Sequence, residues 1–369
     1  MSEQSFSPMV VPGTFIRVRA EGLISVGGIS TGNIGIVGTA IQGAGKTELL
    51  SNYSQAIEKF GRYDASSVGE ANLVRGLELL YANGARTVYA RALAEGDTNF
   101  KAAMDEVIKE DVNILVIPEL PTDTATGSAA ILSGIASTAE NQNKDLFAIV
   151  GSDETDVDAV KTQADAVSNK RLMMVAPGIK AAETLEEGEG EAKTTKTTEV
   201  TLSGNYTAAC VAGLLSATAP HISPTNKVLP AVSDLEYRYA YGELEALLNA
   251  GVAPVELRNG ARVVRGITTD INGPFAQVTT RRIVDKAKAG VRQVGEAFVG
   301  RLNNERVRAA LKGAIQGFLD RMVSDEALLA YGLEVSATRD EQIAGIARVD
   351  LLLQPTFSID YLAVTIVLE

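Results

Sequence analysis

This chain of 369 residues has no tryptophan, one cysteine and one histidine. The single cysteine, Cys210, excludes a disulfide within the chain and a zinc site built from cysteines, and it fits folding in a reducing compartment. With His221 as the lone histidine, a histidine-based metal site lacks its ligands, and a Ser-His-Asp hydrolase lacks a choice of base. We therefore expect no metal, no cofactor and no enzymatic activity.

Positive charge is also scarce. Lys and Arg number 34 against 46 Asp and Glu, which gives a net charge of −12. This balance argues against binding to nucleic acid or to an anionic membrane. No apolar run approaches the ~20 residues of a membrane span, and the first residues lack the basic and apolar regions of a secretory signal. We expect a protein that folds in the cytoplasm, without nucleic-acid partners or direct membrane insertion.

Residues 25–265 show short apolar runs alternating with helical stretches. Strands are predicted at 34–39, 87–93, 113–118, 145–151 and 171–177, and helices at 53–60, 67–83, 129–141, 157–168, 205–219 and 242–249. Strands that alternate with helices predict a parallel sheet covered by helices, hence an α/β fold. Asn259-Gly260 predicts the type I′ turn of a hairpin over 254–267. The stretch 178–198 carries five glutamates and then a Lys/Thr run, which predicts an exposed, solvated loop.

Residues 266–369 have a different pattern, typical of an α+β unit. Two long helices with apolar stripes are predicted at 280–302 and 305–322, followed by strands at 333–338, 347–353 and 356–369. Nine basic residues and three acidic ones lie between positions 281 and 312, a local balance of +6. A basic region on an acidic protein favours contact with an acidic partner or a second copy. The candidates for this contact are Arg281, Arg282, Arg301, Arg306, Arg308 and Lys312.

The stretch 356–369 is the most unusual part of the chain. It begins with the alternation of a half-buried strand and becomes apolar on both faces from Tyr361 onward. Fourteen extended residues span roughly 45 Å. Such a strand either closes the protein's own sheet or is donated to another copy by β-augmentation. The side chains that would make this contact are Phe357, Ile359, Tyr361, Leu362, Val364, Ile366 and Leu368.

The arm at residues 1–24 holds a second strand without an evident partner. Residues 14–19 alternate apolar and polar side chains, and nothing nearby in the sequence pairs with them. We expect Thr14, Phe15, Ile16 and Val18 to contact another subunit.

A glycine-rich loop at 40–47, AIQGAGKT, supplies an alternative function. It resembles a relaxed phosphate-binding P-loop that would use Lys46 and Thr47. Ala40 stands where the first glycine belongs, and Ser51-Asn52 interrupts the helix that should offer its N-terminus to a phosphate. The competing hypotheses are therefore a nucleotide-binding protein, a soluble α/β binding module that pairs its own last strand, and a self-assembling structural protein.

Short motifs in order along nearly the whole chain resemble those of one family. They are Pro12-Gly13-Thr14-Phe15-Ile16, the strand IGIVGTA at 34–40, LLYANGARTVYARAL at 79–93, Cys210-Val211-Ala212-Gly213, Ala250-Gly251-Val252, Thr280-Arg281-Arg282, and Arg348-Val349-Asp350 followed by Tyr361-Leu362-Ala363-Val364. The chain resembles the contractile tail sheath proteins of bacteriophages and related contractile injection systems. It departs from them in having no tryptophan, and Ala253 stands where the family has asparagine.

The resemblance implies a subtilisin-like α/β middle domain without a protease triad and a C-terminal sheath domain with exchanged terminal strands. It implies domains at 25–265 and 266–369, with 1–24 as a linker arm. It also implies subunits that stack as hexameric rings around an inner tail tube and contract, with the tube, baseplate and tail terminator proteins as partners. The particle would be a phage tail or a phage-tail-like particle assembled in the bacterial cytoplasm.

Overall fold

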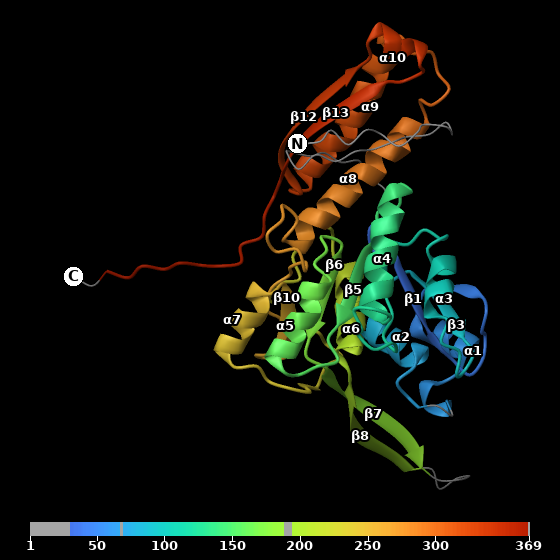
Figure 1. The fold of residues 1–369 in the computed structure, drawn as a ribbon, viewed down its shortest axis with the longest axis vertical. Helices are drawn as coiled ribbons and strands as arrows, with labels where there is room; N and C mark the ends of the chain where they lie inside the picture. The colour runs from blue at the N-terminus through green and yellow to red at the C-terminus, as the bar shows by residue number, and fades with distance from the viewer. Residues whose placement is uncertain (1–29, 67–68, 188–193, 368–369) are drawn as a thin grey trace.

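The computed structural model describes residues 30–66, 69–187 and 194–367. Figure 1 shows an α/β body, a smaller group of two long helices and two strands beside it, and an extended C-terminal segment that leaves both. Five residues for which we predict contacts with another subunit lie outside the described residues: Thr14, Phe15, Ile16, Val18 and Leu368. No helix within the described ranges is both long and apolar enough to cross a membrane.

The body is built on an eight-stranded sheet in the order β11-β10-β6-β5-β4-β1-β3-β2. The strands from β10 to β3 in this order run parallel, while β11 and β2 are antiparallel at the two edges. Their bounds are β1 Ile34–Thr39, β2 Thr47–Leu50, β3 Val88–Leu93, β4 Ile114–Val116, β5 Phe147–Gly151, β6 Leu172–Ala176, β10 Val252–Leu257 and β11 Ala261–Val263. The predicted parallel sheet is thus confirmed, with a mixed α/β architecture.

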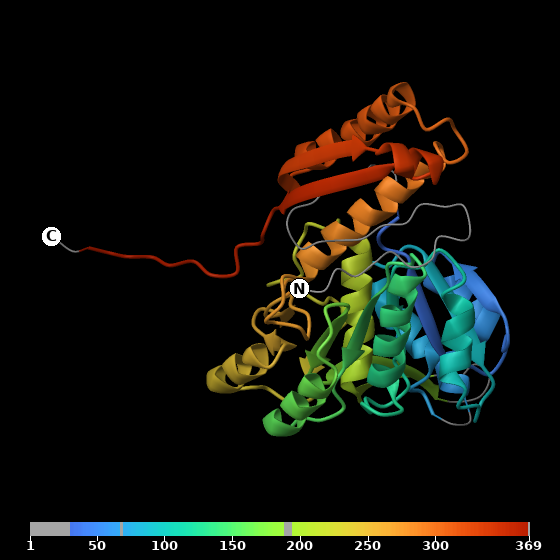
Figure 2. The ribbon, with the colours of Figure 1, turned by 45° about the horizontal axis from the view of Figure 1, so that its top comes forward.

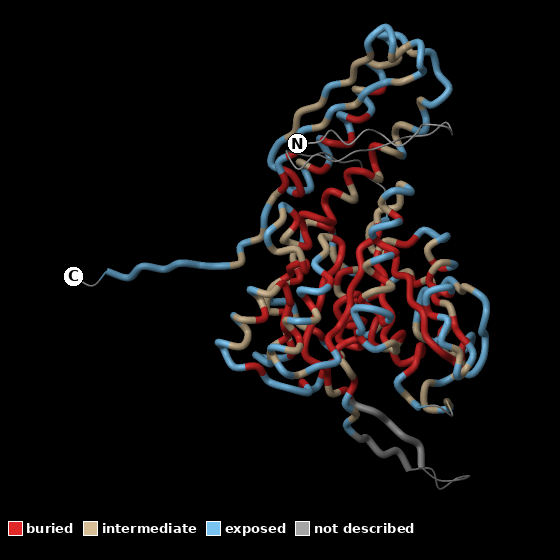
Figure 3. The backbone as a smooth tube through the Cα atoms, in the orientation of Figure 1, coloured by how far each residue is buried: buried red, intermediate tan, exposed pale blue. Residues whose placement is uncertain are grey.

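Helices cover both faces of this sheet, as continuous apolar strands require. One apolar core contains side chains of α1 (Tyr53–Phe60), α2 (Leu73–Ala82) and α6 (Gly204–Ala217). The other contains side chains of α3 (Phe100–Val107), α4 (Ser128–Asn141), α5 (Val157–Ala166) and α7 (Tyr241–Asn249). Figure 3 shows the buried residues concentrated in this body.

The predicted loop at 178–198 is wrong. β7 (Ile179–Glu187) and β8 (Thr194–Leu202) form an antiparallel hairpin, and the start of β7 also pairs with β9 (Asp234–Leu235). The hairpin projects from the body on the side away from the two long helices (Figure 1). Threonine favours strands, and in the register Glu183, Glu186 and Glu187 of β7 pair with threonine positions of β8. Buried Ile179 and Leu202 fix its base.

The C-terminal group has its own apolar core. It consists of α8 (Val278–Glu296), α9 (Glu305–Ser324), β12 (Leu328–Ser336), α10 (Arg339–Ile343) and β13 (Arg348–Pro355). Ile315, Phe318 and Leu319 of α9 are fully or almost fully buried and pack with residues of α8, β12 and β13. The two predicted long helices are confirmed. Figure 2 shows the β12–β13 ribbon lying against α9, with the C-terminal segment leaving from its end.

Candidate assembly interface

The sheet of β12 and β13 is covered on one face. Leu328 and Leu353 are buried against the α9 core, whereas the adjacent Leu329 and Leu352 are 61% and 59% exposed. Within the described part of the chain, β12 and β13 pair only with each other. Each strand therefore keeps one edge of unpaired backbone N–H and C=O groups, which is a template for pairing with an added strand.

The segment that follows β13 provides a strand without a partner. Residues 356–367 form no strand ladder within the described chain. Their apolar side chains face water, with exposed fractions from 60% for Phe357 to 85% for Leu362. Figures 1 and 2 show the segment extending away from the rest of the molecule. In the single chain it does not close its own sheet. A fully buried aliphatic or aromatic side chain contributes about 1.5–3 kcal/mol, so this segment can stabilise a contact with another molecule.

Two of the basic candidates are buried inside this chain, so the prediction that they face the tube or a neighbour is wrong. The Arg281 guanidinium binds Asp285 at 2.5 Å and lies 4.3 Å from the centre of the Phe275 ring. Arg282 donates from Nη2 to carbonyl oxygens at the end of α6, those of Leu215 at 2.7 Å and Thr218 at 3.1 Å. The Leu215 carbonyl also accepts from the backbone N–H and the hydroxyl of Thr218, at 3.4 and 3.3 Å, so Arg282 adds a charged donor to the C-terminal end of α6.

Both arginines are at most 4% exposed. Burial lowers the pKa of Arg282 to about 10, partly opposed by Asp285. The sequence of a helix does not reveal which of its basic side chains bind buried carboxylates or carbonyl oxygens of the same chain. The remaining candidates lie at the surface: Arg301 and Arg306 are exposed, and Arg308 and Lys312 are half-buried. Their contact with a tube or a neighbour stays a prediction.

A buried ionic cluster joins α8 to the α/β body. At its centre is Arg171, which is 0% exposed and lies next to β6. It binds Glu140 and Asp145 at 3.0 Å each, and Asp285 of α8 at 3.1 Å. Two further residues of α8 complete what we call the Arg171 cluster. Lys288 bonds to Asp145, and Arg292 lies 3.2 Å from the same carboxylate.

The cluster keeps Glu140 and Asp285 charged. Burial alone would raise the pKa of Glu140, but the hydrogen bond and charge of Arg171 hold this pKa far below its usual value. Burial would likewise raise the pKa of Asp285, and the charges of Arg171 and Arg281 lower it instead. Sequence analysis missed this cluster. Two features of the sequence could have indicated it: Arg171 stands at the start of an apolar strand, and Asp285 is an acidic residue within a basic helix.

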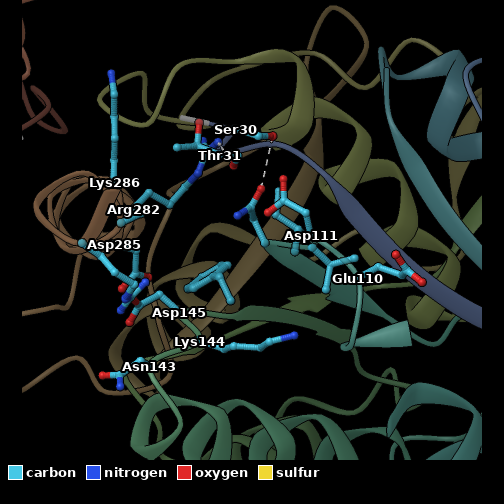
Figure 4. A pocket seen from close by; sticks show the side chains of 16 residues that line it. Ser30, Thr31, Glu110, Asp111, Asn143, Lys144, Asp145, Arg282, Asp285 and Lys286 are labelled. Atoms are coloured by element: carbon cyan, nitrogen blue, oxygen red, sulfur yellow. Dashed lines mark hydrogen bonds and ion pairs between the residues drawn. The ribbon is translucent and has the colours of Figure 1, made fainter. Parts of the chain in front are cut away.

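A polar cavity of about 160 Å³ lies beside the cluster, between α8 and the body. Figure 4 shows Arg282, Asp285 and Lys286 of α8 on one side of it and Asp145, Glu110 and Asp111 on others. Side chains of both signs line the cavity, so it has no evident preference for an anion or a cation. Among the described residues, no group of three or more His, Cys, Asp or Glu side chains is placed to hold a metal ion.

The loop at 40–47 does not have the geometry of a P-loop. Thr47 begins β2, an antiparallel edge strand on β3, so no helix N-terminus follows Lys46 to face a phosphate. A P-loop site also needs an acidic residue to hold magnesium. Glu119, which follows β4, instead accepts hydrogen bonds from the backbone N–H and the hydroxyl of Thr39 at 2.6 and 2.7 Å. The nucleotide-binding alternative therefore finds no support in this geometry.

Comparison with known proteins gives a consistent result. Residues 95–269 match the family model of the phage tail sheath protein central domain, and residues 270–369 match that of the phage tail sheath C-terminal domain. No curated protein matches the sequence.

Solved structures with the same fold cover nearly the whole chain. The sheath of the anti-feeding prophage in its contracted state is 18% identical, with a TM-score of 0.72 over 98% of this chain and 100% of that one. The contracted PVC sheath complex of an extracellular contractile injection system is 13% identical, with a TM-score of 0.73 over 98% and 99%. A crystal structure of a sheath tail protein from Desulfitobacterium hafniense is 14% identical, with a TM-score of 0.65 over 88% and 93%.

Proposed function

This chain belongs to the phage tail sheath protein family, and we propose that it is the subunit of a contractile sheath whose copies join by donating the segment after β13. The observation that carries this proposal is that one molecule has both an unpaired apolar segment and a sheet with free edges. A two-stranded sheet offers two free edges, and an exposed apolar strand leaves the same sheet without a partner. Addition of this strand to a neighbour's sheet would satisfy both.

The organisation of the chain supports a different role for each of its three parts. We propose that residues 25–265 form the body, residues 266–369 form the connecting domain, and residues 1–24 form a second arm that inserts Thr14, Phe15, Ile16 and Val18 into another copy. In the connecting domain, Phe357, Ile359, Tyr361, Leu362, Val364, Ile366 and Leu368 would make the donated contact. One free edge of β12–β13 would receive the C-terminal segment and the other the arm.

The relatives suggest the higher assembly. One solved relative is a baseplate of the anti-feeding prophage with six-fold symmetry, and others are contracted sheaths. We propose that this chain likewise forms stacked hexameric rings around an inner tube, ends at baseplate and tail terminator proteins, and contracts without nucleotide. We propose that Arg301, Arg306, Arg308 and Lys312, which are exposed or half-buried in the single chain, meet an acidic tube or neighbour. The energy for contraction would reside in the packing of the extended sheath.

A charge placed in the donated segment tests this function. Val364 is 70% exposed in the single chain, so Val364→Asp is expected to leave the urea unfolding midpoint unchanged. In an assembled sheath the same carboxylate would enter an apolar contact without a partner, a large penalty. We expect Val364→Asp to form no cylinders or rings in negative-stain microscopy, while the control Val364→Ile assembles like the parent protein. Normal cylinders from Val364→Asp would overturn the proposal.

A further inference from the structure

The segment after β13 does not leave the molecule at once. The backbone N–H of Thr356 donates to the carbonyl of Ala327 at 3.2 Å, and that of Ser358 donates to Oε1 of Gln277 at 3.4 Å. Residues 356–360 therefore run along the protein's own surface, and the free part of the segment begins only at Tyr361.

A buried carboxylate makes the remaining contacts of this stretch. The Asp360 side chain is 5% exposed, although its neighbours Ile359 and Tyr361 are 83% and 75% exposed. Asp360 accepts hydrogen bonds from Arg265 Nε at 2.8 Å and Gln277 Nε2 at 3.1 Å. It also accepts one from the Ser358 hydroxyl at 3.1 Å. A carboxylate this buried is stable only when it is paired and hydrogen-bonded.

Arg265 and Gln277 come from the junction between the body and the connecting domain, and the Thr225 hydroxyl of the body also donates to Asp360, at 3.4 Å. Arg265 follows β11, and Gln277 is the residue immediately before α8. The Arg265 guanidinium also lies 5.3 Å from the centre of the Tyr361 ring, so it contacts both Asp360 and the residue that follows it. These contacts place the departure of the segment at the junction between the body and the connecting domain, away from the end of β13 at Pro355.

We propose that Arg265, Gln277 and Asp360 form an anchor that fixes where the donated segment leaves its own subunit. Residues 361–369 then extend to the neighbouring copy, and the contact proposed above is narrowed, because Phe357 and Ile359 stay on the subunit that donates the segment. This inference rests on the proposed function and deepens it. Nine extended residues span about 30 Å, whereas fourteen residues free from Thr356 would span about 45 Å. The anchor thus shortens the reach of the segment and orders five residues before any contact forms. Preordering of this kind strengthens association by reducing the entropy lost on binding.

A label on unassembled protein tests the anchor itself. Nitroxide labels are attached at Ile359→Cys or Val364→Cys, since the native Cys210 is buried. We expect a restricted label at 359 and a mobile one at 364. Asp360→Arg, which faces Arg265 with a like charge, should mobilise the label at 359, and the exchange Asp360→Arg with Arg265→Asp should restrict it again. Charge reversal in another ion pair, Asp234→Arg beside Arg238, is the matched control and should change neither label. Equal mobility at 359 and 364 in the parent protein would overturn the anchor.

Assembly of the unlabelled variants tests what the anchor does. Because each contact must then order five more residues, Asp360→Arg and Arg265→Asp are each expected to raise the lowest protein concentration that supports assembly by at least about tenfold. The double exchange should recover most of this loss. If Asp360→Arg frees the label but assembles at the parent concentration, the anchor has no part in donation and the proposal is wrong. If Val364→Asp still assembles while the labels behave as expected, the donated-strand function fails and the anchor remains.

Discussion

Deletion of residues 361–369 is expected to abolish assembly and to leave a chain as stable as the full-length protein. The reason is that this segment is exposed in the single chain: Leu362, Val364 and Ile366 are 85%, 70% and 80% exposed. Their removal takes no apolar surface from the three cores. In a sheath, the same deletion would remove main-chain pairing and several buried aliphatic side chains, each worth about 1.5–3 kcal/mol, at every contact between copies.

Sedimentation and negative-stain microscopy measure the assembly, and urea unfolding measures the stability of the subunit. The deletion starts after Asp360, so it keeps the ion pair of that residue with Arg265. An unchanged unfolding midpoint together with the absence of polymer is the expected outcome. A truncated chain that unfolds would mean that the segment completes its own fold, and a truncated chain that forms full cylinders would mean that the segment is dispensable.

Replacement of Arg171 by methionine is expected to destabilise the subunit by about 3–5 kcal/mol, because it removes one partner from a buried ionic cluster and leaves the others uncompensated. Arg171 is 0% exposed and contacts Glu140, Asp145 and Asp285. Denaturant unfolding of the unassembled chain measures the loss. The control is Arg348→Met, which breaks an ion pair with Glu341 whose arginine is 51% exposed. That change is expected to cost about 0–1 kcal/mol. Similar losses for both variants would contradict the role of the cluster.

We also expect Arg171→Met to change the pH at which the subunit unfolds in acid. The pKa values of Glu140 and Asp285 are lowered in the folded chain, because Arg171 and its neighbours outweigh the effect of burial. A lowered folded pKa gives stability that is present above the unfolded pKa, near 4, and that is lost as pH falls towards the folded value. Without Arg171 these folded pKa values rise, so acid unfolding of Arg171→Met should begin at a higher pH. Acid-unfolding curves with the same midpoint for parent and variant would show that Arg171 does not hold these pKa values down.

Sequence periodicity predicted the body well because its strands are apolar on both faces. The strands β1, β3, β5 and β6 were located to within two residues. The helix predicted at 67–83 begins later, at Leu73, because the Asn72 side chain accepts hydrogen bonds from the backbone N–H groups of Val74 and Arg75. The edge strand β2, with the sequence TELL, is too short and polar to be recognised. The helix α3 was also missed.

Charged residues were the least predictable part of the candidate interface. We predicted a loop for the hairpin of β7 and β8 from its many charged residues. Composition does not show that the acidic positions of one strand pair with the Lys/Thr positions of the other. The basic pattern of α8 did not reveal that Arg281 and Arg282 are buried. The anchor was missed for a similar reason, since one aspartate in an alternating strand pattern gives no sign of a partner at Arg265. Partners that are distant in the sequence decide the role of each of these charges.

Photo-crosslinking from the donated segment tests most directly whether one copy gives this strand to another. A photoreactive residue replaces Val364 in protein prepared in two forms, one of natural isotopic composition and one labelled with heavy nitrogen, and the two are mixed before assembly. We expect crosslinked peptide pairs that join the segment to residues of β12 or β13, with light–heavy pairs as frequent as random mixing allows. Crosslinks that join only peptides of the same isotope, or that avoid β12 and β13, would contradict strand donation between subunits.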